Sequence, residues 1–245
     1  MKKRCRSSTE ELTMKRVVLK RKKLIPAIFQ ERPNRFLARV LIEGEETLAH
    51  VPDPGRLKEL LTPGVEVYLR PAVGERKTKF DLVLVKHQGL LVSLESTLPN
   101  RLVEHALKEG FFEELAHYPQ IQREVTYGES RLDFCLSNHR DRCFIEVKSV
   151  TLVEDSVALF PDAPTIRGAR HLRELIKIKE EGMRAISLFI IQRDDATSFS
   201  PHAKMDPFFT STLKQAQASG VEVWAYKCKN TLDAILLENQ VPVRL

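Results

Sequence analysis

Between Arg35 and Ser96 the chain alternates apolar and polar residues with a period of about two, the pattern of half-buried β-strands. Glycines, prolines and polar turns divide this stretch into five apolar segments, at residues 36–42, 47–51, 65–69, 80–86 and 90–94. Residues 55–61 carry apolar side chains at helical spacing, so we expect a short helical stretch there. Five short strands in some 60 residues predict a small OB-fold-like barrel rather than a sandwich.

The pattern changes at residues 98–100, where helical spacing replaces alternation. We expect a helix that has Asn100 as its N-cap and ends at Gly110. Further strands are expected at 121–127, 131–136, 143–152, 185–192 and 221–226, and further helices at about 166–181 and 207–219. This mixture predicts a second domain of the α/β type with a mixed sheet. The chain is then a two-domain α+β or α/β protein, divided into a basic flexible tail (1–23), a five-stranded barrel domain (24–97) and an α/β domain (98–245).

The segment RLDFCLSNHRDRCFIEVKSV carries the clearest chemical signal in the chain. A short polar loop joins its two apolar strands, so we expect them to pair as an antiparallel hairpin. Alternation along the first strand is expected to place Leu132, Phe134 and Leu136 on one face. Asp133 then points to the other face. If the turn lies at the middle of the loop, facing residues have numbers that sum to about 279, so Asp133 stands opposite Glu146.

Two opposed carboxylates destabilise a hairpin unless a positive charge lies between them. A divalent cation supplies that charge, and carboxylate oxygens with water are the ligands that Mg²⁺ prefers. Lys148 follows Glu146 by two residues on the same face, where it could hold an attacking water or neutralise a phosphate. The pattern therefore predicts Asp133 and Glu146 as ligands of Mg²⁺ or Mn²⁺, with Lys148 as a further catalytic residue of phosphodiester hydrolysis. A hairpin with a charged solvent face is the alternative explanation.

An acidic residue on the preceding helix, Glu104, completes a known arrangement. Glu-x-Lys on a strand, an Asp about a dozen residues upstream and an acid on the helix before it form the PD-(D/E)xK nuclease pattern. In this chain Leu132-Asp133 replaces the Pro-Asp pair of that pattern. Glu104 is thus the fourth catalytic candidate, and an ordinary surface glutamate is the alternative.

Seven longer segments lie between about Arg35 and Tyr226: RFLARV, HVPDPGRLKELL, LPNRLVEHAL, SRLDF, IEVKSVTL, FPDAPTIRGARHLREL and GVEVWAY. Together they resemble the sugar fermentation stimulation protein (SfsA) family, and FPDAPTIRGARHL is the most specific of them. The resemblance implies an N-terminal OB-fold, a PD-(D/E)xK nuclease-like domain and non-specific DNA binding. It also implies that Asp133, Glu146 and Lys148 occupy the nuclease motif, with Glu104 as the helix acid.

Basic residues at the start of the helix at 166–181 suggest an anion site. Thr165 is expected to be its N-cap, which places Arg167 and Arg170 in the first turns, where cations oppose the helix dipole. A phosphate bound by free N–H groups and by guanidinium groups would explain them, and a solvated helix start is the alternative. His171 is expected to be structural. Further candidates for nucleic-acid contacts, in the barrel half, are Arg56, Lys58, Lys77 and Lys79.

The positive charge of the chain is concentrated at its N-terminus. The net charge is +6, but residues 1–23 hold ten basic and two acidic side chains, which leaves 29 basic and 31 acidic residues elsewhere. Such a tail attracts nucleic acid or an acidic membrane surface, or it is only a solvated extension. The longest apolar run, near residues 186–191, is far shorter than the roughly 20 residues of a membrane span. The four cysteines lack CxxC spacing and no secretory signal is visible, which indicates reduced thiols in a cytoplasm.

These observations predict a cytoplasmic protein that binds DNA without sequence preference and carries a nuclease-like site dependent on Mg²⁺ or Mn²⁺. No membrane partner is expected, and a homodimer is compatible with the sequence. One alternative is a catalytically inactive, regulatory DNA-binding protein on a nuclease scaffold. Another is a hydrolase of small nucleotides, or a scaffold without a nucleic-acid role.

Overall fold

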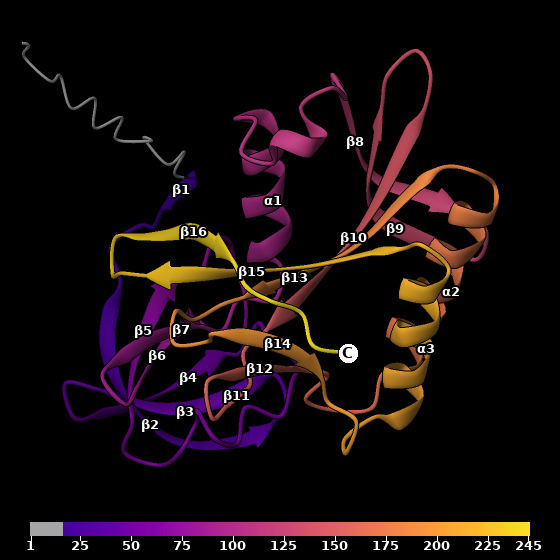
Figure 1. The fold of residues 1–245 in the computed structure, drawn as a ribbon. Helices are drawn as coiled ribbons and strands as arrows, with labels where there is room; N and C mark the ends of the chain where they lie inside the picture. The colour runs from indigo at the N-terminus through magenta and orange to yellow at the C-terminus, as the bar shows by residue number, and fades with distance from the viewer. Residues whose placement is uncertain (1–16) are drawn as a thin grey trace, which may run out of the picture.

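In the computed structural model, which describes residues 17–245, the first domain is a β-barrel (Figure 1). Its strands are β2 (Ile25–Asn34), β3 (Leu37–Ile42), β4 (Glu45–His50), β5 (Glu66–Pro71), β6 (Phe80–His87) and β7 (Leu90–Ser93). They follow the order β4-β3-β2-β5-β6-β7, and a pairing between β4 and β6 closes the five strands β2 to β6 into a barrel. Alternate apolar side chains, such as Val40 and Val67, fill its interior. The predicted OB-like five-stranded barrel is therefore confirmed.

The strands that form the closed barrel differ from the predicted ones. β2 was not predicted because only Ala27 and Phe29 of its ten residues are buried, and its pairing with β3 is interrupted by register shifts. The predicted strand at 90–94 is β7, which adds to β6 outside the closed ring. The helical stretch predicted at 55–61 is wrong, because the segment forms turns and Leu57 has a left-handed φ of 51° that no helix accommodates.

The second domain is built on a seven-stranded mixed sheet, as predicted. Its strands, in spatial order, are β1 (Val17–Lys20), β16 (Ala234–Gln240), β15 (Glu222–Asn230), β13 (Arg184–Ile191), β10 (Arg142–Val150), β9 (Ser130–Ser137) and β8 (Gln120–Tyr127). The central strands β10, β13 and β15 are parallel, and antiparallel strands extend the sheet on both sides. The apolar run predicted at 185–192 is β13, which is buried on both faces.

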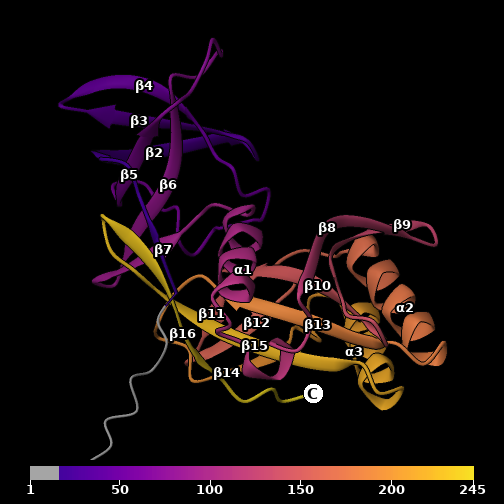
Figure 2. The same ribbon diagram turned by 90° about the horizontal axis from the view of Figure 1, so that it is seen from above.

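Helices cover both faces of this sheet, as Figure 2 shows. The helix α1 (Leu98–Lys108) and the short 3₁₀ turn η1 (Glu113–Leu115) pack on one face, against Phe134 and Ile145. The helices α2 (Ile166–Glu180) and α3 (Pro207–Ala218) pack on the other, against Phe144 and Phe189. The predicted helices at 166–181 and 207–219 are confirmed within two residues at each end.

Several elements fall outside the sequence-based prediction. A small sheet joins β11 (Val153–Glu154), β12 (Val157–Phe160) and β14 (Ser198–Pro201). The end of the predicted tail is β1, which pairs with β16 and buries Val17 against α1, whereas residues 1–16 lie outside the described residues. The barrel is attached to the second domain at Ser93, whose N–H donates to the carbonyl of Gln192 (3.2 Å). Of the helices within residues 17–245, none has the length and apolar character of a membrane span.

A candidate carboxylate site at the β9–β10 hairpin

The register of the hairpin is the predicted one. Ile145 pairs with Phe134 and Cys143 with Leu136, so the numbers of facing residues sum to 279. Asp133 and Glu146 are the next residues along β9 and β10, directly beyond the last ladder pair. The sequence thus predicts correctly which two carboxylates the hairpin brings together.

The predicted alternation along β9 is wrong at one point. Leu132 packs in the cluster under α2 and α3, whereas Phe134 and Leu136 pack in the cluster under α1, on the opposite face. The cause is an irregularity in which the β8–β9 ladder skips the pair Glu124–Asp133, with Glu124 at a left-handed φ of 53°. Asp133 therefore lies at the point where the apolar side chains of β9 change from one face of the sheet to the other. Its carboxylate can then contact the backbone of the adjacent strand, β10.

Asp133 is held by two donors. Its Oδ1 accepts a hydrogen bond from Asn100 Nδ2 on α1 (2.6 Å), and its Oδ2 accepts one from the backbone N–H of Val147 (2.8 Å). Burial and, after it, the charge of Glu146 raise the pKa of Asp133 to about 6 in spite of these donors. Asn100 was predicted as the N-cap of α1, which is wrong: Thr97 occupies that position, and Asn100 lies inside the helix.

Glu146 is 3% exposed and receives two donors on one oxygen. Lys148 Nζ and His171 Nδ1 both donate to its Oε1. Burial by itself would raise the pKa of Glu146, but the charge of Lys148 and the His171 hydrogen bond outweigh it and hold the pKa below its ordinary value. Arg167 Nε donates to His171 Nε2 (3.3 Å), which leaves the ring proton on Nδ1 for Glu146.

A metal ion fits this donor set. Glu146 Oε2 is buried and has no hydrogen-bond partner among the described residues, and each oxygen of Asp133 keeps a lone pair beyond the bond it accepts. Within residues 17–245 no group of three or more His, Cys, Asp or Glu side chains is arranged as a metal cluster. The donors that the chain offers here are the oxygens of two carboxylates, the ligand type that Mg²⁺ accepts together with water.

Glu104 is not brought to the carboxylate pair by any interaction within residues 17–245. Its side chain forms ion pairs with Lys108 of the same helix (2.7 Å) and with Arg123 of β8 (2.6 Å). The hydrogen bond from Lys108, followed by the charge of Arg123, lowers the pKa of Glu104. From α1 it is Asn100, one turn earlier, that contacts Asp133. Asn100 was missed as a site residue because its role depends on how α1 packs on the sheet.

The predicted basic residues occupy three places. Thr165 is the N-cap of α2, as predicted, and accepts from Gly168 N, with Arg167 and Arg170 exposed in the first turns. Arg56 and Lys58 are exposed and line one cavity at the edge of the barrel, whereas Lys77 and Lys79 are exposed in the loop between β5 and β6. His171, expected to be structural, lies behind Arg167 and contacts Glu146.

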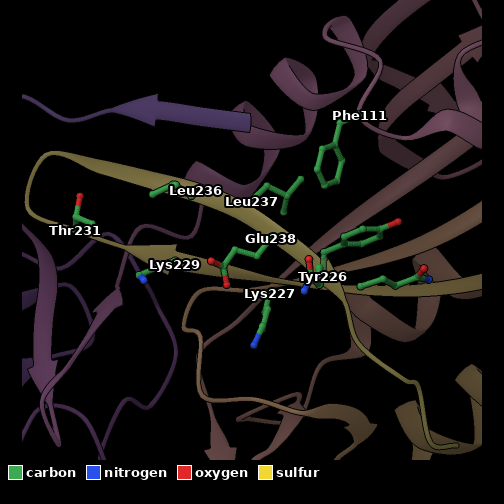
Figure 3. Close-up of a pocket in the computed structure, with 10 residues that line it drawn as sticks. Phe111, Tyr226, Lys227, Lys229, Thr231, Leu236, Leu237 and Glu238 are labelled. Carbon is green, nitrogen blue, oxygen red and sulfur yellow. The ribbon is translucent and has the colours of Figure 1, made fainter. Parts of the chain in front are cut away.

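A different cavity, of about 550 Å³, lies along the hairpin of β15 and β16 (Figure 3). Phe111 and Tyr226 form one wall, with their ring centroids 5.9 Å apart, and Lys227 and Glu238 lie on the hairpin beside them. None of the residues predicted for catalysis, metal or nucleic-acid binding lines this cavity. It is therefore separate from the carboxylate site.

The fold and the site define a class of protein in which an OB-like barrel precedes an α/β domain with a carboxylate pair on adjacent strands. The family model described as "SfsA N-terminal OB domain" matches residues 31–94, and the one described as "Sugar fermentation stimulation protein RE domain" matches residues 97–234. The chain belongs to the sugar fermentation stimulation protein family.

Relatives of the chain are similar over nearly their whole length. The sugar fermentation stimulation protein homologue of Desulforamulus reducens is 49% identical over 222 residues, which cover 91% of this chain and 93% of the relative. The homologue of Moorella thermoacetica is 50% identical over 223 residues, which cover 90% of this chain and 95% of the relative. The structure of SfsA from Pyrococcus furiosus in complex with Ca²⁺ is 32% identical, has a TM-score of 0.87 and covers 93% of this chain and 98% of its own.

Proposed function

We propose that the protein binds DNA without sequence preference and hydrolyses phosphodiester bonds at Asp133 and Glu146 with a divalent cation, Mg²⁺ or Mn²⁺. The observation that carries this proposal is the buried, unpartnered Oε2 of Glu146 next to a second carboxylate on the adjacent strand. A buried anionic oxygen without a donor is costly, and a shared cation would offset that cost. The relative from Pyrococcus furiosus, described in complex with Ca²⁺, supports the proposal because Ca²⁺ also prefers oxygen ligands.

The residues of the chain would divide the work as follows. Asp133, fixed by Asn100 and by the Val147 N–H, and Glu146, fixed by His171, would hold the cation through carboxylate oxygens. When bound, the cation would polarise a phosphate oxygen and lower the pKa of a bound water. Lys148 Nζ lies at Glu146 Oε1, where it would orient the attacking water and balance the charge that develops on the phosphate.

The exposed cations would supply the nucleic-acid contacts. Arg167 is joined to Glu146 through His171, so a phosphate bound at Arg167 would lie near the carboxylates. Arg170 is exposed in the same first turns of α2. In the barrel the proposed contacts are Arg56, Lys58, Lys77 and Lys79, all exposed.

The test is incubation of linear and circular DNA with Mg²⁺ or Mn²⁺, with wild type, Asp133→Asn and Lys148→Ala side by side. Asp133→Asn should abolish cation binding, measured by calorimetry, and with it cleavage. Lys148→Ala should leave cation binding largely intact and remove turnover, because an ammonium group is not a metal ligand. Equal cleavage by wild type and Lys148→Ala would place any activity outside this site.

An inactive DNA-binding protein is the second candidate, and one observation favours it. Glu146 Oε1 is already satisfied by Lys148 and His171, so part of the site is neutralised by the chain's own cationic side chain. Under this alternative, wild type retains DNA but leaves linear and circular DNA uncut with either cation. DNA retention that is absent even at low salt would contradict both candidates.

A further inference from the structure

Half of the residues that line a cavity at the junction of the two domains are positively charged. The cavity measures about 640 Å³, and four of its lining residues are the cations Arg32, Arg35, Arg56 and Lys58. No acidic residue lines it, and Ala163 closes it from the α/β domain. Arg56 and Lys58 were predicted from the sequence as nucleic-acid contacts, whereas Arg32 and Arg35 were not.

Arg32 shapes the wall of this cavity by holding the loop that follows β4. Its Nη1 donates to the carbonyls of Gly55 (2.7 Å) and Arg56 (2.8 Å), and its Nη2 donates to the carbonyls of Asp53 (2.9 Å) and Arg35. Three of these carbonyls belong to the loop after β4 and the fourth to the turn between β2 and β3, so one guanidinium joins the two segments. Arg32 Nε is buried and has no partner among the described residues.

The α/β domain holds the same loop from the other side. Asp162 Oδ2 of the α/β domain accepts from the backbone N–H of Arg56 (2.7 Å), and within the loop itself Asp53 Oδ1 accepts from that of Gly55 (2.8 Å). The two carboxylates lie so close to Gly55 that a Cβ there would be 2.3 Å from Asp162 Oδ2. The cavity is thus a built feature of both domains together, not a chance gathering of surface side chains.

The charges of Asp53 and Asp162 act on Arg32, but the other three cations of the cavity have no acidic partner in the described part of the chain. Within residues 17–245, no ion pair involves Arg35, Arg56 or Lys58. The nearest carboxylates, Asp53 and Asp162, do not line the cavity and are engaged by backbone N–H groups. Several converging cations with unfilled donors are the signature of a phosphate site.

The distance from this cavity to the carboxylate pair is limited by the chain itself. Arg167 follows Ala163 by four positions, so their Cα atoms lie at most about 14 Å apart. Arg167 reaches Glu146 through His171. A strand of a few nucleotides would therefore be long enough to contact both the cavity and Arg167.

We propose that this cavity binds a backbone phosphate of the DNA strand that reaches Asp133 and Glu146, a few nucleotides away from the cleaved bond. The second half of this statement rests on the proposed function. The barrel and the α/β domain then bind the same DNA strand. The strand must therefore have a minimum length to contact both places. An oligonucleotide too short to span both places cannot use the cavity.

The experiment measures the binding of end-labelled oligothymidines of roughly three to twelve nucleotides by fluorescence anisotropy, in EDTA. The test variants are Arg35→Glu and Lys58→Glu, both exposed. The matched controls are Arg140→Glu, in the β9–β10 loop, and Lys214→Glu, on α3, which make the same charge changes outside the cavity. Wild type and controls should gain affinity above a threshold length. Each test variant should lose that gain and lower the salt slope by about 0.7, the value for one phosphate contact to a single strand.

The outcomes separate this inference from the proposed function. Because EDTA prevents metal-dependent cleavage, failure of hydrolysis does not affect the readout. If wild type binds DNA and the test variants have the same affinity as the controls at every length, the cavity inference alone is overturned. Wild type that binds no oligonucleotide would overturn DNA binding itself. Inorganic pyrophosphate provides the last arm: if it binds at the cavity without displacing oligothymidine, the site serves a free phosphate and the DNA assignment is wrong.

Discussion

At the scale of single residues, Asp53 couples the stability of the domain junction to pH. It is 8% exposed, and burial, supported by the charge of Asp162, raises its pKa to about 6 although the Gly55 N–H donates to it. A folded-state pKa above the unfolded value of 3.8 means that the protonated form is favoured on folding. This contribution to stability is complete below the unfolded pKa and is lost as the pH rises through about 6.

Asp53→Asn should therefore stabilise the protein selectively at neutral and alkaline pH. The amide keeps an oxygen for the Gly55 N–H but carries no charge to desolvate. The difference in free energy of unfolding between variant and wild type should increase by roughly 3 kcal/mol from about pH 4 to about pH 8. Urea denaturation at the two pH values measures it, and a difference independent of pH would contradict the explanation.

Asn100 is the residue-scale test of how Asp133 is positioned. Asn100→Leu removes the donor to Asp133 Oδ1 and leaves the buried contacts of α1 in place, since Asn100 is only partly buried. A side chain that orients a metal ligand typically accounts for about 10–100-fold in affinity, so Mg²⁺ binding should weaken by that factor. Calorimetry with Mg²⁺ measures the loss, with Arg101→Leu, the exposed neighbour on the same helix, as the control. Unchanged affinity in Asn100→Leu would show that Val147 N–H alone positions Asp133.

The residues of the site were predictable only where they are local in sequence. Asp133, Glu146 and Lys148 follow from a short hairpin whose register is set by its loop, and the 279 sum is confirmed. Asn100 and His171 reach the same carboxylates from helices on opposite faces of the sheet, so their roles depend on long-range packing. No periodicity in the sequence specifies which residue of a helix touches a distant strand.

At the scale of elements, the loop after β4 depends on the absence of a side chain at Gly55. A Cβ would lie 2.3 Å from Asp162 Oδ2 and 2.9 Å from Asp53 Oδ1. Gly55→Ala should break the bond from the Arg56 N–H to Asp162 and cost roughly 1–3 kcal/mol of unfolding free energy. In an Asp162→Ala background the cost of Gly55→Ala should shrink, which a double-mutant cycle measures. Additive effects would exclude the clash with Asp162 as the cause.

Strands were predictable where apolar and polar residues alternate clearly along the sequence. They were missed where their burial depends on packing against another element. β3 to β6 follow from period two, as does β13 from its continuous apolar run. β2 has two prolines and an irregular register, and β16 is recognisable mainly through its partners β15 and β1. The apolar spacing of residues 55–61 resembles a helix, but these leucines instead fill the barrel while the backbone turns.

At the scale of the whole molecule, part of the basic N-terminal segment (residues 1–23) belongs to the sheet of the α/β domain. Val17–Lys20 is β1, and Arg21 donates to Asn230 Oδ1 (2.8 Å), so these residues are part of the α/β domain. Residues 1–16, outside the described part, contain six basic and two acidic side chains. A deletion that tests the charge of the tail must therefore stop at residue 16, because removal of residues 1–23 also removes an edge strand.

Deletion of residues 1–16 should weaken DNA binding equally for all sequences and flatten its salt dependence. Each phosphate contact that is lost lowers the slope of log K against log salt by about 0.9, because fewer counterions are released. The temperature of thermal unfolding should be unchanged by this deletion. Deletion of residues 1–23 should lower it, because the edge of β16 that pairs with β1 is then exposed. Arg167→Ala in the shorter protein should then remove most of the affinity that remains. An unchanged salt slope after deletion of 1–16 would show that the segment contacts no phosphate and is a solvated extension.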